Sequence, residues 1–232
     1  MKKLCDFIRN LFLVPRCYVC RKAIGKEETG LCDYHRRQYA EERQIRCPIC
    51  HISYDKCRCL PQFASPYIRS YTRVARYREQ SAVGKMLLRA KDSSEGRLYD
   101  FLAKEMVNVL QNAGVSVDLV TYIPCSKESF ERRGFDHGER LAKRIAKQLC
   151  ISAEATLLCK KGEAQKTLQA QQRLENSKKR FAPKRGAGKK IAGKRVLLVD
   201  DILTSGASSL VASIHLNELG AQSVDFVCFG GK

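Results

Sequence analysis

The chain has 232 residues, 44% of them hydrophobic, and it carries a formal net charge of +19. This length and apolar content fit one α/β domain with a small additional module, and they exclude a disordered chain. No apolar run is long enough to span a bilayer, so the sequence also argues against membrane insertion.

The first fifteen residues combine two lysines with an apolar stripe. The apolar positions recur at helical spacing, which predicts an amphipathic helix, and Asp6 and Arg9 interrupt them, so the segment does not resemble a secretory signal. We therefore expect a cytoplasmic protein. In that reducing compartment the twelve cysteines favour metal binding over disulfide formation.

Eight potential metal ligands follow between residues 17 and 59. Two cysteines separated by two residues form a tight turn that binds one tetrahedral ion, and a second pair about a dozen residues later completes the ligand set. Taken in sequence order, the ligands predict two closed, structural zinc sites: Cys17, Cys20, Cys32 and His35, then Cys47, Cys50, Cys57 and Cys59. The short spacing between the last two cysteines leaves open a single zinc ion with crossed pairing.

Residues 63–115 connect this module to the rest of the chain. Residues 65–80 are rich in Tyr and Arg with rough alternation, which predicts an edge strand or an antiparallel strand pair. Apolar positions at helical spacing predict helices over residues 83–91 and 98–114.

Strand and helix patterns then alternate along the chain. We expect strands over residues 117–123, 155–159, 196–200 and 224–229, and helices over residues 137–149 and 207–219. This alternation predicts an α/β fold with a parallel, doubly wound sheet. The expected division is a helix and zinc-binding module in residues 1–62 and a second domain in residues 63–232, with leading strands and helices in 63–115 and the core sheet in 116–232. We find no internal repeat.

Positive charge is concentrated before the strand at residue 196. Residues 126–195 hold 20 Lys and Arg against 7 Asp and Glu, and residues 177–195 hold nine basic residues and no acidic one. A solvated, mobile loop is one interpretation. The other is nucleic-acid binding, because neutralising phosphates releases counterions and gives affinity without sequence preference. The candidate residues are Lys178, Lys179, Arg180, Lys184 and Arg185.

The stretch RVLLVDDILTSGASSL, residues 195–210, carries the clearest chemistry. Its apolar run predicts a strand buried on both faces, and the apolar positions after Ala207 predict a helix. The turn between them lies where open α/β sheets bind ligands, and small residues there let the backbone approach a phosphate. Asp200 and Asp201 would repel that phosphate and instead suit hydroxyl groups or a cation. A ribose 5-phosphate is the simplest ligand that combines these groups.

Two other interpretations of this stretch compete with a ligand site. The apolar run and acid pair also resemble the start of a phosphate-accepting receiver domain, but residues 202–232 are too few to complete one. A buried strand followed by an ordinary polar turn is the second.

The same stretch resembles the phosphoribosyl pyrophosphate (PRPP) loop of the type I phosphoribosyltransferases. Upstream, YIPCSKESFERRGFDHGERLA and QKTLQAQQRLENSKKRF resemble two further blocks of the ComF family of competence-associated proteins. In the second block Gln165, Leu168, Arg173, Asn176 and Phe181 match. Two departures are that the loop has Ser205 and Ser208 where threonines are commoner, and that Asp136 replaces the usual Asn.

The resemblance implies roles for individual residues. The loop residues would bind the 5-phosphate: Thr204, Ser205, Gly206, Ala207 and Ser208. Asp200 and Asp201 would bind the ribose hydroxyls, directly or through Mg²⁺. Pro124, Arg132 and Arg133 would lie near the pyrophosphate, and Arg173 with residues 178–180 would belong to a closing loop.

Two functions follow from these patterns. The resemblance implies a competence factor that binds PRPP and acts on single-stranded DNA during DNA uptake, with a competence helicase or other DNA-processing proteins as partners. The alternative is a phosphoribosyltransferase that uses Mg-PRPP and an unidentified nitrogen acceptor. Whether the chain catalyses a reaction stays open at this stage.

Overall fold

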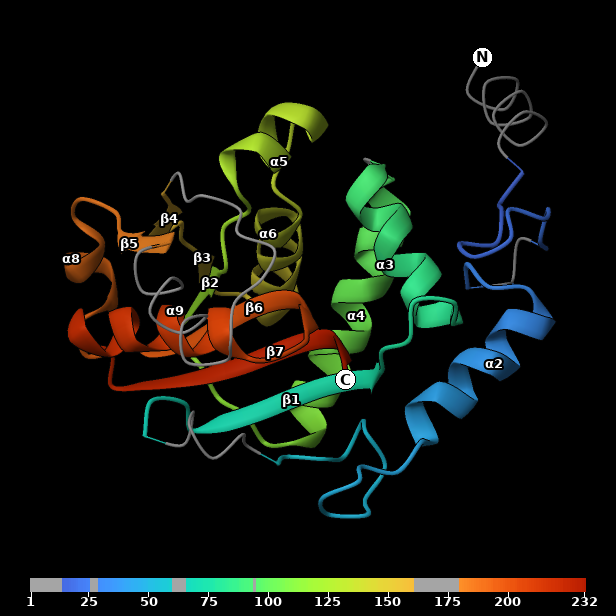
Figure 1. The fold of residues 1–232 in the computed structure, drawn as a ribbon, viewed down its shortest axis with the longest axis horizontal. Helices are drawn as coiled ribbons and strands as arrows, with labels where there is room; N and C mark the ends of the chain where they lie inside the picture. The colour runs from blue at the N-terminus through green and yellow to red at the C-terminus, as the bar shows by residue number, and fades with distance from the viewer. Residues whose placement is uncertain (1–13, 26–28, 60–65, 94, 161–179) are drawn as a thin grey trace, which may run out of the picture.

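The computed structural model describes residues 14–25, 29–59, 66–93, 95–160 and 180–232 (Figure 1). The predicted N-terminal helix, the block around Arg173, and Lys178 and Lys179 lie outside them. The elements in chain order are α2 (Asp33–Gln44), β1 (Ser70–Arg76), α3 (Ala82–Asp92), α4 (Gly96–Asn112), β2 (Leu119–Tyr122), α5 (Lys127–Arg133), α6 (His137–Leu149), β3 (Ser152–Ala153), β4 (Leu157–Cys159), β5 (Phe181–Pro183), α8 (Ala187–Ile191), β6 (Arg195–Leu203), α9 (Ala207–Glu218) and β7 (Ser223–Gly231).

Five strands form a parallel sheet in the order β1-β7-β6-β2-β3. The central strand β6 is buried on both sides over residues 196–199, as its unbroken apolar run predicts. Its carboxyl end lies beside those of β7 and β2, because Leu203 pairs with Gly231 and Val199 with Tyr122. The loops after these strands therefore meet at one edge of the sheet.

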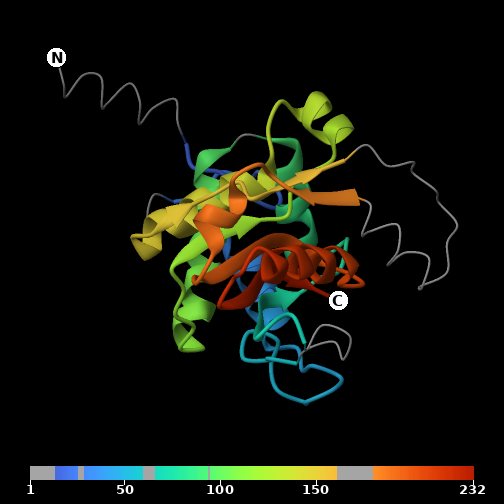
Figure 2. The same cartoon turned by 90° about the vertical axis from the view of Figure 1, so that its left-hand side faces the viewer.

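Helices cover both faces of the sheet (Figures 1 and 2). One face packs against α3, α4 and α6 around a large apolar cluster that includes Val199, Leu102 and Ile145. The other face packs against α8 and α9, with Leu198 and Val211 among the buried contacts. The expected parallel, doubly wound α/β fold is confirmed.

The sequence-based element boundaries need three corrections. Residues 70–76 form a parallel edge strand, so the antiparallel alternative is wrong. Residues 157–159 do not join the main sheet but pair antiparallel with residues 181–183, and the short β3 takes the edge position instead. Strand β6 extends to Leu203, beyond the predicted end at residue 200, so Asp201 also lies within the strand.

The cysteine-rich head, residues 14–59, packs directly on the α/β core. Tyr39 of α2 stacks on Phe229 of β7, with ring centroids 6.1 Å apart, and also contacts Phe101 of α4. Tyr18 lies against the same Phe101 ring at 5.7 Å. The head and the sheet thus share one hydrophobic cluster.

Helices long and apolar enough to cross a bilayer do not occur in the part of the chain that the structure describes.

Candidate functional site

A tight loop joins the central strand β6 to α9. Gly206 begins the helix with φ +77°, a backbone conformation that glycine adopts without the steric penalty of a side chain. Asp200 and residues 202–209 line a hollow of about 40 Å³. Thr204 and Ser205 are exposed, and the first N–H groups of α9 have no helical partner, so hydroxyl and amide donors surround this hollow. An anionic group such as a phosphate suits it.

The loop is fixed from below by a buried hydrogen-bond chain. The Ser209 hydroxyl donates to the Gly206 carbonyl at 2.8 Å, and its oxygen lies 2.6 Å from the Tyr71 hydroxyl of β1. Tyr71 is fully buried. The edge strand therefore supports the loop from two strands away, and Ser209 serves the loop conformation while Thr204, Ser205 and Ser208 remain for a ligand.

The two acids lie at the same sheet edge and differ in their surroundings. Asp201 is buried, with one carboxylate oxygen 2.8 Å from the Lys91 Nζ of α3 and the other 3.6 Å from the His137 Nε2 of α6. Asp200 points to the other face of the strand and accepts the Asp201 backbone N–H at 2.9 Å. Carboxylate oxygens of both acids and the His137 ring lie within 4.8 Å of one another.

These surroundings shift the pKa values of the two carboxyl groups in opposite directions. Burial and the neighbouring Asp201 charge raise the pKa of Asp200 well above its usual range. Burial also raises the pKa of Asp201, but the His137 and Lys91 side chains outweigh it and hold that pKa below the usual range. Asp201 is therefore the ionised member, and Asp200 is prone to hold a proton until a cation reaches it.

A bound Mg²⁺ fits these donors in part. Magnesium in proteins uses one or two carboxylates and completes its shell with water and substrate oxygens. Asp200 and Asp201 supply such carboxylates, whereas an imidazole is a poor magnesium ligand and His137 suits a role beside Asp201.

The loop after β2 borders the acid pair on the side of α6. Asp136 starts α6 and is buried; its carboxylate accepts N–H groups of Gly138 at 2.8 Å, Glu139 at 3.2 Å and Cys125 at 2.8 Å. It therefore ties the residue after Pro124 to the start of the helix. Arg133 lies close by, with its Nη1 3.4 Å from the His137 Nδ1.

The three residues predicted to lie near the pyrophosphate differ in burial and in position. Arg133 is partly buried, and its Nε has no hydrogen-bond partner in the described part of the chain, so its guanidinium retains a donor. Arg132 is exposed on α5. Pro124 precedes the loop that Asp136 holds, at the carboxyl end of β2.

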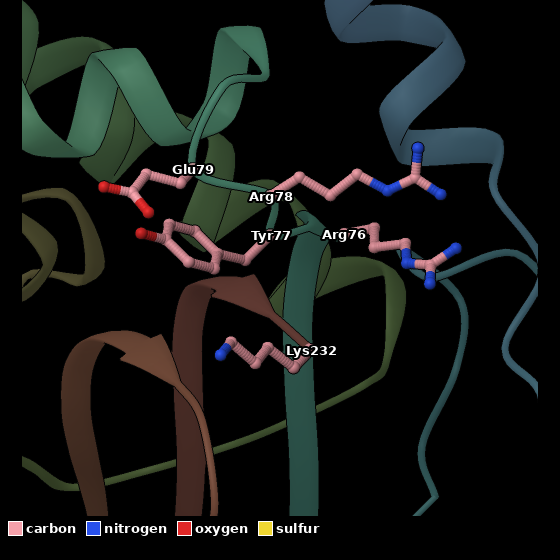
Figure 3. A pocket seen from close by; sticks show the side chains of 5 residues that line it. All are labelled: Arg76, Tyr77, Arg78, Glu79 and Lys232. Atoms are coloured by element: carbon pink, nitrogen blue, oxygen red, sulfur yellow. The ribbon is translucent and has the colours of Figure 1, made fainter.

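A second hollow of about 350 Å³ adjoins the loop at the ends of β1 and β7 (Figure 3). Its lining side chains are Arg76, Tyr77, Arg78, Glu79 and Lys232. The Lys232 N–H donates to the Leu203 carbonyl at 3.1 Å, which puts this hollow next to the start of the 204–208 loop. Figure 3 shows the Tyr77 hydroxyl, the Glu79 carboxylate and the Lys232 amine on one side, and the Arg76 and Arg78 side chains extending to the other.

The eight predicted metal ligands form two compact clusters. Each set lies within 4.8 Å, and the sets are those of the sequential pairing: Cys17, Cys20, Cys32 and His35, then Cys47, Cys50, Cys57 and Cys59. The sulfurs of Cys20 and Cys32 are 3.9 Å apart and those of Cys50 and Cys57 are 3.5 Å apart. Tetrahedral zinc with bonds of about 2.3 Å to sulfur puts its ligands about 3.8 Å apart. Both clusters could hold zinc, and crossed pairing does not match the geometry.

The two clusters repeat one backbone turn. Cys17 N–H donates to the Lys22 carbonyl at 2.9 Å, and thirty residues later Cys47 N–H donates to the Ile52 carbonyl at 2.8 Å. The residue after the second cysteine of each turn has positive φ, at Arg21 and His51. The head thus contains the internal repeat that the sequence analysis missed.

Hydrogen bonds prepare one thiol in the second turn for metal binding. Burial raises the pKa of Cys47, but N–H groups of Cys50 and Ile49 outweigh burial and bring the pKa to about 7. A thiol with this pKa readily supplies the thiolate that a zinc ion needs.

The described part of the basic segment lies on β5 and before α8. Arg180, Lys184 and Arg185 are exposed, and none of them forms an ion pair with another described residue. Lys190 of α8, in contrast, pairs with Glu154 at 2.6 Å. These three unpaired cations therefore lie together just before and just after β5.

Two residues beside the acids escaped the sequence analysis. Lys91 lies 110 positions before Asp201, in a helix whose pattern indicated only packing. His137 directly follows the Asp136 that the resemblance singled out, so its position in that block was the only available signal.

Comparison with known proteins supports the assignment of the fold. Residues 135–232 match the family described as phosphoribosyl transferase domain. No curated protein matches the chain.

Solved structures resemble the chain at low sequence identity. Glutamine PRPP amidotransferase from B. subtilis, complexed with ADP and GMP, is 22% identical with a TM-score of 0.42, over 61% of this chain and 30% of that one. The chain thus matches less than a third of that enzyme's length. Adenine phosphoribosyltransferase from Thermoanaerobacter pseudethanolicus is 16% identical with a TM-score of 0.38, over 62% of this chain and 72% of that one. The parallel sheet with its covering helices has a phosphoribosyltransferase-type fold, and residues 135–232 match the model of that domain.

Proposed function

We propose that the chain binds Mg-PRPP at the β6–α9 loop and is a member of the ComF family. The observation that carries the proposal is the acid pair, Asp200 and Asp201, placed directly before a loop whose glycine has positive φ and whose donors surround a small hollow. The loop would bind the 5-phosphate through Thr204, Ser205 and the N–H groups at the start of α9. The acids would accept hydrogen bonds from the ribose hydroxyls.

The same geometry supports transfer of the ribosyl group. The bond from C1 of the ribose to pyrophosphate breaks, the pyrophosphate leaves with the electron pair, and a nitrogen nucleophile forms the new bond at C1. Mg²⁺, when bound, would neutralise the leaving diphosphate. Lys91 and Arg133 would bring positive charge to that side, and the fixed loop would hold the ribose still, so positioning and electrostatics supply the catalysis.

An acceptor would enter through the hollow at the ends of β1 and β7 (Figure 3). Arg76, Arg78 and Lys232 outnumber the one carboxylate there, and Tyr77 offers an aromatic face. These groups favour a planar, negatively charged acceptor.

We also propose that the head holds two structural zinc ions. All four positions of each cluster are protein side chains, which leaves no open site for a substrate. The zinc ions would therefore stabilise the head and take no part in the transfer.

Calorimetric titration with Mg-PRPP tests the main proposal. The double variant Asp200→Asn with Asp201→Asn should abolish binding, because the carboxylates that would bind the ribose hydroxyls and Mg²⁺ are lost. A matched control, Asp33→Asn with Asp118→Asn, removes the same charge from an exposed helix position and from the opposite end of the sheet, and should bind as the parent does. Unchanged affinity in the acid-pair variant would refute the proposal.

A competence role on single-stranded DNA is the second candidate. It is favoured by the unpaired cations Arg180, Lys184 and Arg185 beside β5 and by the net charge of +19. Affinity for single-stranded DNA should then fall with salt at a slope of about −0.7 per phosphate contact. Replacing the five basic candidates with Gln should flatten this slope: Lys178, Lys179, Arg180, Lys184 and Arg185.

The control for this experiment replaces five exposed lysines on other surfaces: Lys56, Lys104, Lys127, Lys143 and Lys147. Both variants remove five positive charges, so the comparison separates binding by the basic segment from a general effect of net charge. Measurements with and without saturating Mg-PRPP report whether the two ligands are coupled. A parent protein insensitive to salt, or equal slopes in both variants, would leave the phosphoribosyltransferase alternative.

A further inference from the structure

The head touches α3 through a buried carboxylate. Glu42 of α2 is 7% exposed, and its two oxygens accept the N–H groups of Ala82 at 3.0 Å and Val83 at 2.9 Å. These are the first residues of α3, whose N–H groups have no partner within the helix. A charged acceptor at a helix N-terminus also interacts favourably with the helix dipole. Glu42 therefore completes the cap of α3 from another part of the chain.

The start of α3 is closely confined by its neighbours. Ser81 caps the helix by accepting the Gly84 N–H at 3.1 Å. A Cβ atom at Gly84 would lie 2.2 Å from the Arg78 carbonyl, so only glycine fits there. With Glu42 on its first N–H groups as well, the helix has little freedom to shift or rotate at this end.

The other end of α3 reaches the acid pair. Lys91, in its last turn, lies 2.8 Å from Asp201. An α-helix rises about 1.5 Å per residue and behaves as a stiff rod over this length. A displacement at Ala82 would therefore be carried to Lys91. At the far end of α2, the metal-cluster residues Cys32 and His35 hold the beginning of that helix.

We propose that Glu42 is a positioning residue through which the cysteine-rich head sets the place of Lys91 at the PRPP site. This proposal rests on the proposed function, because Mg-PRPP is the ligand that Lys91 would meet. The head then serves as more than a separate zinc module, since it orients a cation at a site that its own residues do not reach.

A double-mutant cycle tests the coupling. Glu42→Ala should lower Mg-PRPP affinity about tenfold, because a displaced Lys91 would lose about one charged hydrogen bond to the ligand. The zinc content should stay at the parent's level. Lys91→Met should lower affinity by a similar factor. The double variant should lose no more than either single variant, because Glu42 acts only through Lys91. Glu42→Gln retains one carbonyl acceptor, so its Mg-PRPP affinity should lie between those of the parent and Glu42→Ala. It replaces the alanine variant in the cycle if that variant fails to fold.

The neighbouring Arg43 provides the matched control. Its guanidinium lies 2.6 Å from Glu105 of α4, so Arg43→Gln weakens the attachment of the same helix α2 without touching α3. This variant should bind Mg-PRPP as the parent does. Additive losses in the double variant, or an equal loss in Arg43→Gln, would overturn the positioning role and leave the PRPP site intact. A parent that does not bind Mg-PRPP would overturn the proposed function, and this proposal with it.

Discussion

Replacing Asp136 with Asn should destabilise the protein, although the two side chains have the same size. The Asp136 carboxylate accepts three backbone N–H groups, with Oδ1 facing Gly138 and Glu139 and Oδ2 facing Cys125. An asparagine has one acceptor oxygen and one NH₂ group. If its oxygen caps the helix, its NH₂ group opposes the Cys125 N–H, and one of the three hydrogen bonds is replaced by two facing donors.

The expected cost follows from these contacts. Leaving a buried N–H without an acceptor costs about 1–3 kcal/mol. Asp136→Ala also loses the helix cap, which is worth about 1 kcal/mol, so its loss should reach about 2–4 kcal/mol. The predicted order of stability is therefore Asp, then Asn, then Ala.

Urea unfolding at constant zinc concentration measures this order. The slope of the unfolding free energy against urea concentration should be the same for the three proteins, since the surface exposed on unfolding does not change. Mg-PRPP affinity should also fall in Asp136→Asn, because the loop after β2 loses the bond that holds Cys125. An asparagine variant as stable as the parent would refute the role of the second oxygen.

Three further predictions concern other parts of the molecule. Metal analysis of the purified protein should find two zinc ions per chain, because the ligands form two separate clusters; a value near one would contradict the paired sites. Gly206→Ala should cost about 1–2 kcal/mol in urea unfolding, since φ at this position is +77°, and it should weaken Mg-PRPP binding. The Asp118 carboxyl should titrate near pH 2 by NMR, because the Arg195 hydrogen bonds lower its pKa to about 2. Its folded pKa lies below the unfolded value, so the Asp118–Arg195 pair stabilises the fold above pH 4 and loses that effect as the pH falls towards 2. In Arg195→Gln the pKa of Asp118 should rise towards its ordinary value, because the guanidinium is lost and only the backbone N–H of residue 195 still donates to the carboxylate.

Local patterns in the sequence predicted the elements that depend on neighbouring residues. The apolar run of β6, the glycine after it and the helical stripe of α9 all lie within about 25 residues, and each has the predicted form. The helix at residues 137–149 matches its predicted bounds for the same reason: Asp136 caps it and the apolar stripe continues to its end.

Contacts between distant segments were not predictable in this way. The run at residues 157–159 has the composition of a strand, but its composition does not reveal that its partner lies at residues 181–183. Lys91 looks like any surface lysine of an amphipathic helix until the fold brings it to Asp201. The repeated turn of the head was readable from the sequence, since Arg16-Cys17 and Arg46-Cys47 begin the two turns thirty residues apart.

The matched region, residues 135–232, is smaller than the folding unit that its residues require. Strand β2, at residues 119–122, lies between β6 and β3, so a chain starting at residue 135 would expose the edge of the central strand and separate β3 from the sheet. An exposed edge of this kind favours aggregation. Tyr71 of β1, which supports the loop through Ser209, and Lys91 would be lost as well. The residues that give the loop its shape and charge thus come from both sides of residue 135, and the upstream half of the chain is a necessary part of the site.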